Sequence, residues 1–585
     1  MCRLSGSKKE KDRGNAEARN VCEYSLMQLK QVEHIFTSKS LFLNPTESSM
    51  ENISLIVLLL FGVAFLGVLS KKYKFPFPIA LVLSGLAISL IPGLPVIALK
   101  PEIVFLVFLP PLLYSAAWYT SWHDFKVNRR SISLAAVGLV LFTTVLVAIA
   151  AHTVVQDLSW PTAFLIGAIV SPPDAVAASS ITKGLGLSPR LLAVLEGESL
   201  VNDASGLIAF KYALAAVMAG NFVFWKAGVD FMEVVLVGIA IGLAIGYLMY
   251  LVHKTFVCEP VIDATLTFLT PFASYLIAEH FHFSGVLAVV STGLYLSFRS
   301  ATIFSNESRI MTYAVWDVVV YILNGLIFIL IGLQLRSVME GIKEYSVGQL
   351  AMYGIVVSLV TIIVRFIWIM PIAFLPKIFG AKEKMNDYET GFNSRNLVVF
   401  GWAGMRGVVS MAAALSLPLL LPDGTAFPHR NLVIYLTFCV ILSTLVLLGF
   451  TLPFVIKKLK IEPYSIAVEE YDVRTKVVNN TIIYIEENLS QESDEILNNI
   501  KSKYEIKYNR LQKTDLPKNY FGGNESIAGN RFNEFSQLQI DLIGVERKTL
   551  EDLHRNGQAS EEILRKIERE LDLEETRLQM EMYEE

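Results

Sequence analysis

The sequence predicts an all-α membrane protein that crosses the bilayer many times, and three observations support this prediction. Hydrophobic residues make up 53% of the 585-residue chain and charged residues only 18%, whereas a soluble domain carries about 25% charged residues. The mean hydropathy is +0.49. About thirteen runs are apolar over the roughly 20 residues that a membrane-spanning helix requires. The net charge of −4 does not favour a nucleic-acid partner.

The predicted spans lie between two polar segments. Their approximate ranges are 52–70, 76–92, 103–120, 131–152, 161–182, 191–218, 231–252, 264–280, 284–298, 313–335, 349–375, 395–420 and 431–456. The extension 1–49 lacks the apolar stretch of a secretory signal. We interpret Met50 as the start of the protein, the alternative being a polar N-terminal tail. Residues 50–460 are then the transmembrane domain, and residues 461–585 a separate C-terminal tail.

Basic residues predict on which side of the membrane the tail lies. Lys71 and Lys72 follow the first span, Lys457 follows the last, and every second loop between them is richer in Lys and Arg than its neighbours. Because cytoplasmic loops carry the excess of basic residues, the first span enters from outside and the tail is cytoplasmic. The tail is expected to be helical, since apolar residues recur there at helical spacing in "EEILRKIERELDLEETRL".

Two of the predicted spans are interrupted near the middle. The fifth contains Pro172 and Pro173, and proline removes a backbone N–H and clashes with the preceding turn. The twelfth contains Gly404 and Gly407 on either side of Arg406. If spans 1–6 and spans 8–13 are taken as two sets, each interruption lies in the fifth span of its set. Interrupted helices at matching positions are typical of inverted-repeat transporters with a site near the midplane. The alternative is two unrelated kinks, because Gly and Pro are common in membrane helices.

The sixth predicted span carries acidic residues in its apolar sequence. Charged residues inside a membrane are usually functional, and we expect Asp203 to bind an ion, the alternative being a structural pair with an arginine. Ser199 shares the face of Asp203, whereas Glu198 and Asn202 lie within hydrogen-bonding reach of each other at i, i+4. For Glu198 we expect a buried ion pair with Arg365 of the eleventh span, because an unpaired charge would be costly. A place for Glu198 in the ion site is the alternative.

A buried carboxylate can be neutralised either by a proton or by a hard cation. Oxygen atoms of Ser199, Asp174 and the carbonyls freed near Pro173 suit a small hard cation. If only an occupied site crosses the membrane, this competition becomes exchange of a cation for H⁺. We therefore predict an antiporter for Na⁺, and also for Li⁺, with K⁺/H⁺ exchange and a passive cation channel as alternatives. No enzyme motif, cofactor site or metal centre is found in the sequence.

Six motifs in a fixed order resemble the bacterial sodium/hydrogen exchangers of the monovalent cation:proton antiporter superfamily. They are "FLPPLLYSAA" (108–117), "SPPDAVAAS" (171–179), "EGESLVND" (196–203), "FSGVLAVVSTGL" (283–294), "GMRGVVSMAAALSLP" (404–418) and "IERELDLEETRL" (567–578). The resemblance implies a homodimer with dimerisation helices and a mobile core that moves by an elevator-like shift. It also implies sodium and pH homeostasis at the cell membrane.

The resemblance assigns roles to residues that match the family's motifs. It implies that Asp203 binds cation and proton in turn, that Asn202 supports it, and that Arg406 lies where two unwound helices cross. An Asn-Asp pair resembles the electroneutral branch, which exchanges one cation for one proton. Two departures from the family's pattern bear on cation selectivity: Ser115 replaces an acidic residue that many relatives carry, and Pro173 replaces a threonine.

Overall fold

The computed structural model of the chain describes two compact units, Met1–Phe65 with Gly93–Pro95, and Leu66–Pro92 with Val96–Glu585. The described residues are 48–91, 103–120, 122–182, 185, 187–219, 224–256, 259–342, 345–378, 394–461, 464, 466–488, 498, 500–505, 508, 529–556 and 558–583. The predicted extension therefore lies almost entirely outside the described residues, and its interpretation stays a prediction. The sites and contacts below belong to the second unit.

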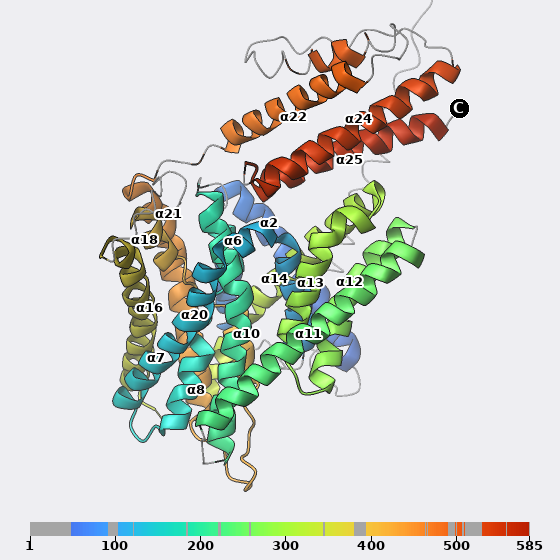
Figure 1. Cartoon of the computed structure of the whole chain (residues 1–585). Coiled ribbons are helices and arrows are strands. Elements are labelled where there is room, and N and C mark those ends of the chain that lie inside the picture. The colour runs from blue at the N-terminus through green and yellow to red at the C-terminus, as the bar shows by residue number, and fades with distance from the viewer. Residues whose placement is uncertain are drawn as a thin grey trace, which may run out of the picture. The chain divides into compact units, whose positions relative to one another are not determined.

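Helices account for nearly all regular structure in the described residues (Figure 1). The α-helices are α2 (Ser48–Tyr73), α3 (Phe77–Ser89), α5 (Leu109–Tyr119), α6 (Trp122–Ser133), α7 (Val140–Val154), α8 (Trp160–Val170), α9 (Ala175–Thr182), α10 (Pro189–Ala219), α11 (Phe224–Phe256), α12 (Pro260–His280), α13 (Gly285–Ile303), α14 (Asn306–Leu333), α15 (Leu335–Glu340), α16 (Val347–Ile378), α18 (Ser394–Trp402), α19 (Val408–Leu415), α20 (Arg430–Ser443), α21 (Gly449–Lys458), α22 (Ile466–Asn488), α24 (Gly529–Arg555) and α25 (Glu561–Tyr583). Short π-helical segments, η2 (Val104–Phe108), η3 (Leu134–Leu139) and η4 (Thr444–Leu448), continue directly into neighbouring helices.

The prediction of a helical protein that spans the membrane many times is confirmed. In the described part of the chain, eight helical stretches are long and apolar enough to cross a bilayer, and three shorter apolar helices accompany them. The count of thirteen spans stays a prediction. The fifth and twelfth predicted spans are each divided into two short helices, α8 with α9 and α18 with α19, at the positions where the sequence predicts a break.

Local sequence explains where several helices begin. Ser159, Ser284 and Ser305 precede α8, α13 and α14, and the hydroxyl oxygen of each accepts a hydrogen bond from a backbone N–H of the first turn. A serine at this position satisfies a backbone donor that has no partner within the helix. Short polar side chains thus cap the N-termini of these three helices.

The membrane helices pack in two groups. In the first, here called the α13 group, α13 packs on α5, α11 and α12, while α14 packs on α3 and α12. In the second, the α8 group, α8 packs on α7 and α10, and α16 packs on α7 and α20. The two groups meet where α10 contacts α5 and α13 and where α14 contacts α19. The candidate site lies at this meeting of the groups.

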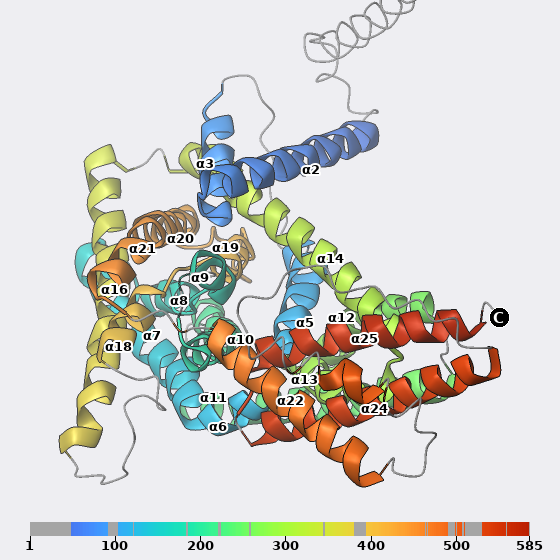
Figure 2. The ribbon, with the colours of Figure 1, turned by 90° about the horizontal axis from the view of Figure 1, so that it is seen from above.

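The tail forms its own helical layer, in which α22, α24 and α25 lie side by side (Figures 1 and 2). Ile563, Ile567 and Leu571 of α25 are at most 4% exposed and belong to one apolar core with residues of α22 and α24. These residues thus lie in a helix, as their spacing predicts, and the structure buries their apolar face within the tail.

Candidate functional site

The two interrupted helices meet at their breaks. The chain leaves α8 at Val170 and enters α9 at Ala175, and it leaves α18 at Trp402 and enters α19 at Val408. The backbone N–H of Asp174 in the first break donates to the carbonyl oxygen of Met405 in the second, over 2.6 Å. Irregular backbone at membrane depth is tolerated where it is buried in protein or lines a cavity. Here the two breaks satisfy part of each other's hydrogen bonding.

Arg406 links both breaks and is 1% exposed. Its Nε donates to the carbonyl oxygen of Val170, over 3.0 Å, and its Nη1 donates to the carbonyl oxygen of Gly404. The backbone N–H of Arg406 donates to the hydroxyl oxygen of Thr444, over 3.0 Å. Carbonyls at a helix C-terminus carry partial negative charge. The guanidinium therefore neutralises the ends of α8 and α18 where they face each other.

Asp174 is the acidic counterpart of Arg406 at the crossing. Its Oδ1 accepts hydrogen bonds from the backbone N–H groups of Val176 and Ala177, over 2.9 and 3.3 Å, and the carboxylate is also bonded by the backbone of Val408. These donors belong to the first turns of α9 and α19, whose N-termini carry partial positive charge. A Cβ at Gly407 would overlap Oδ2 of Asp174, so the close approach of the two segments requires glycine there.

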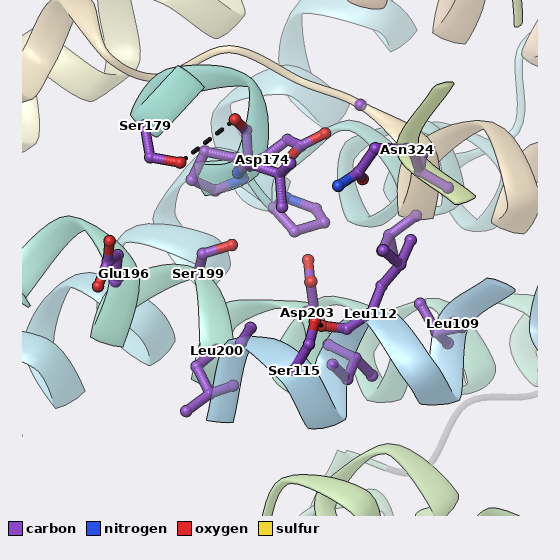
Figure 3. Close-up of a pocket in the computed structure, with 18 of the residues that line it drawn as sticks. Leu109, Leu112, Ser115, Asp174, Ser179, Glu196, Ser199, Leu200, Asp203 and Asn324 are labelled. Atoms are coloured by element: carbon purple, nitrogen blue, oxygen red, sulfur yellow. Dashed lines mark hydrogen bonds between the residues drawn. The ribbon is translucent and has the colours of Figure 1, made fainter. Parts of the chain in front are cut away.

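Asp203 lies in a cavity of about 230 Å³ beside this crossing. Figure 3 shows the side chains of Asp203 on α10 and of Asp174 facing the same space from opposite sides. Ser199, one turn before Asp203, and both prolines of the first break also line the cavity. In the part of the chain that the structure describes, no basic side chain forms an ion pair with Asp203. The cavity is therefore lined by oxygen ligands that include the carboxyl groups of Asp203, Asp174 and Glu196.

Glu198 has a different environment from Asp203, although both lie on α10. Its two carboxylate oxygens accept hydrogen bonds from Nη1 and Nη2 of Arg365, over 2.7 and 2.8 Å, and both side chains are 1% exposed. The Nε of Arg365 donates to the carbonyl oxygen of Phe400, over 3.2 Å. The pair thus connects α10 and α16 of the α8 group with α18.

The predicted hydrogen bond between Glu198 and Asn202 is wrong. Asn202 is fully buried, and its Oδ1 and Nδ2 make no hydrogen bond with any described residue. Spacing of i, i+4 places two side chains on one helix face, but both oxygens of Glu198 are engaged by Arg365. Asn202 also lies outside the cavity lining, whereas Asp203, Ser199, Asp174 and Pro173 belong to it.

Several further residues line the cavity, of which the sequence singles out only Ser115, for its bearing on cation selectivity. Ser115 and Tyr119 come from α5, Asn324 from α14, Ser410 from α19, and Glu196 from α10. The hydroxyl of Tyr119 donates to Oδ1 of Asp317, over 3.1 Å. A polar residue within an apolar run, such as Asn324 in "YILNGLIF", is a usable signal. Its membership of this cavity depends on which helix faces α10, which a single sequence does not specify.

Comparisons with known proteins agree on one family. The family model described as "Sodium/hydrogen exchanger, transmembrane" matches residues 56–458. The "Sodium, potassium, lithium and rubidium/H(+) antiporter" of Bacillus pumilus (strain SAFR-032) is 30% identical over 475 residues, which cover 79% of this chain and 70% of the relative. The "Na(+)/H(+) antiporter ApNhaP" of Aphanothece halophytica is 30% identical over 417 residues, covering 71% of this chain and 75% of the relative.

A solved structure supports the fold. The sodium proton antiporter MjNhaP1 from Methanocaldococcus jannaschii, in its structure at pH 8, aligns with a TM-score of 0.54. The two proteins are 20% identical, and the alignment covers 71% of this chain and 99% of the archaeal one. At this level of identity the likeness concerns the fold.

Proposed function

The chain belongs to the sodium/hydrogen exchanger family, and from this membership we propose that Asp203 binds the exchanged cation and the proton in turn. The protein is a multi-pass membrane antiporter that exchanges Na⁺ for H⁺, and it is not an enzyme. The observation that carries the proposal for Asp203 is its position: a carboxylate on a membrane helix, in a cavity, without an ion-pair partner among the described residues.

The charge balance around the cavity supports this role. Arg406 faces helix C-termini, Asp174 faces helix N-termini, and Glu198 is paired with Arg365. The charge of Asp203 has no such compensation, and a charge inside a membrane costs about 2.5–3.5 kcal/mol on the insertion scale. Binding of either H⁺ or an alkali cation removes that cost. The two ligands compete because each neutralises the same carboxylate.

The oxygen atoms near Asp203 are suited to a hard cation. The hydroxyl oxygen of Ser199, the carbonyl oxygen of Pro173 and the second carboxylate oxygen of Asp174 belong to residues that line the cavity. Oxygen ligands are preferred by hard cations. Asn202 supports the site only indirectly in this proposal, through its position next to Asp203 in α10.

The cavity also lies where alternating access requires it to lie. Its wall includes α5 and α14 of the α13 group, and α10 with the two breaks on the side of the α8 group. In the proposed cycle the α8 group moves relative to the α13 group and carries Asp203 from one side of the membrane to the other. Only the protonated or the cation-loaded site moves, so that one cation is exchanged for one proton.

The proposal extends to orientation and assembly. The tail is cytoplasmic, as the excess of basic residues in alternate loops indicates, and the protein acts as a homodimer in the cell membrane. K⁺ is a second candidate substrate, because the Bacillus pumilus relative is named for sodium, potassium, lithium and rubidium.

Exchange in proteoliposomes tests the assignment of Asp203. The substitution Asp203→Asn is expected to abolish Na⁺-dependent proton movement under an imposed pH gradient, while the protein still folds and inserts. Glu233→Gln, which removes an exposed carboxylate of α11 outside the cavity, is the matched control and should exchange at the wild-type rate. Exchange at the wild-type rate in Asp203→Asn would refute the assignment.

The same vesicles separate the alternatives. Replacing Na⁺ by Li⁺ or K⁺ identifies the preferred cation. An electroneutral antiporter moves cation and proton in opposite directions at a rate that an imposed membrane potential does not change. Cation flux without proton counterflow would instead identify a passive channel.

A further inference from the structure

The tail helix α25 is joined to the membrane helices by a buried ion pair. Asp572 of α25 accepts hydrogen bonds from Nε and Nη2 of Arg309 in the first turn of α14, over 2.9 and 2.5 Å. Arg547 of α24 also donates to Asp572, over 2.7 Å. The side chains of Asp572 and Arg309 are 4% and 8% exposed. Breaking a buried pair by removing one partner is strongly destabilising, so this contact fixes α25 against the start of α14.

A second contact lies two turns earlier on α25 and reaches α5. Nη2 of Arg565 donates to the carbonyl oxygen of Trp118, over 3.0 Å, in the last turn of α5. Carbonyls in this turn lack partners within the helix, and a cation near them is favourable. The guanidinium carbon of Arg565 also lies 5.1 Å from the centre of the Tyr119 ring. The planar group therefore contacts both the backbone and the last side chain of α5.

Tyr119 connects the tail to the ion cavity. It is the last residue of α5 and one of the residues that line the cavity around Asp203. Its hydroxyl donates to Asp317 of α14, over 3.1 Å, while its ring faces Arg565. The side chain is thus held at its hydroxyl by a membrane helix and at its ring by the tail.

We propose that Arg565 is a positioning residue for transport: it holds Tyr119 at the tail-facing end of the cavity and so restricts cation access to Asp203 from that side. The inference rests on the proposed function of the cavity. Arg565 acts through the orientation of the Tyr119 ring, while its charge is paired with Glu561, whose Oε1 accepts a hydrogen bond from Nε of Arg565 over 2.8 Å. This restraint on the ring disappears when the arginine is removed.

The expected result of Arg565→Ala is easier cation entry from one side only. The KM for Na⁺ presented on the tail side should fall about two- to fivefold, the size expected for a partly exposed cation–π contact. The KM for Na⁺ presented on the opposite side and the maximal rate should stay unchanged. Vesicles with a single orientation are selected by capture of an affinity tag at the end of the tail.

Two further variants distinguish positioning from charge and from damage to the tail. Arg569→Ala is the matched control, because Arg569 is an exposed arginine one turn further along α25. Arg565→Lys keeps the charge but loses the planar group that lies against the ring, and it should still lower the tail-side KM. Tyr119→Ala leaves Arg565 in place and should lower the tail-side KM even if Arg565→Ala itself folds poorly.

The double variant decides whether Arg565 acts through Tyr119. If it does, Arg565→Ala should have no further effect on KM in the Tyr119→Ala background, since coupled residues are not additive. An unchanged KM in both single variants, an equal change on both sides of the membrane, or full additivity would each overturn the inference. Failure of the proposed function is recognised separately. In that case Asp203→Asn would retain exchange, whatever the result for the Arg565 variants.

Discussion

At the scale of single residues, two carboxylates of α10 differ in role because their neighbours differ. Asp203 lines the cavity, whereas both oxygens of Glu198 are bonded to Arg365 in a nearly water-free environment. A buried pair contributes little net stability when intact, but removal of one partner leaves an uncompensated charge. In our proposal, the same chemical group therefore serves ion binding at one position and structural support at the other.

This difference predicts that Glu198→Ala lowers stability more than it affects the ion site. The free energy of unfolding should fall by about 3–5 kcal/mol, because Arg365 would stay buried without a partner. The midpoint of thermal unfolding of the purified protein measures the effect. The double variant with Arg365→Met should recover part of the loss. An unchanged midpoint together with lost cation binding would instead place Glu198 in the ion site.

At the scale of secondary-structure elements, the crossing of the two broken helices depends on close backbone contact. Asp174 forms hydrogen bonds with the backbone at both breaks. Arg406 donates a hydrogen bond to the carbonyl oxygen at the C-terminal end of α8. Half-helices expose partial charges of opposite sign at their two kinds of end. One acidic and one basic side chain offset these charges, and we propose that a mobile ion neutralises Asp203 in the cavity beside them.

The crossing should not tolerate a side chain at position 407. Gly407→Ala would place a methyl group on the carboxylate of Asp174, and such overpacking costs about 1–3 kcal/mol. We expect exchange activity and the thermal midpoint to fall together in this variant. Gly348→Ala on α16 is the control, since a Cβ there meets no atom within 4 Å. Wild-type exchange by Gly407→Ala would show that the contact between the breaks is dispensable.

At the scale of the whole second unit, a titratable side chain of the tail, Glu568, interacts with an arginine of the membrane helices, Arg309. Burial raises the pKa of Glu568 on α25 to about 7, in spite of the nearby guanidinium groups of Arg309 and Arg565. Glu561 and Asp572 raise the pKa further through their negative charges. The packed tail thus holds a proton on Glu568 at a pH at which the unfolded tail, with a usual pKa of 4.5, has released it.

The raised pKa of Glu568 predicts that the packed tail loses stability as the pH rises. Stability from this group is fully present below about pH 4.5 and is lost as the pH approaches 7, by up to about 3 kcal/mol. Glu568→Gln should remove this part of the pH dependence and protect the tail from proteolysis at pH 7–8. Limited proteolysis between pH 5 and 8 measures the effect. Glu562→Gln, at an exposed position of the same helix, should behave as wild type.

From the sequence alone it follows that the protein is a helical membrane protein, where two of its spans break, and which polar residues lie within them. These properties are local: apolar run length, helical period and the backbone limits of proline act within a few residues. The motifs around Pro173, Asp203 and Arg406 also indicated the family that the comparisons then confirmed.

Which of these polar side chains share a cavity depends on how the helices pack, and this was known only from the folded molecule. It placed Asn202 outside the lining and added Tyr119 and Asn324 to it. It also brought Arg565 of the tail onto Tyr119, across more than four hundred residues of chain. Such contacts depend on which faces of distant helices meet, and helical spacing within one segment specifies only which residues share a face.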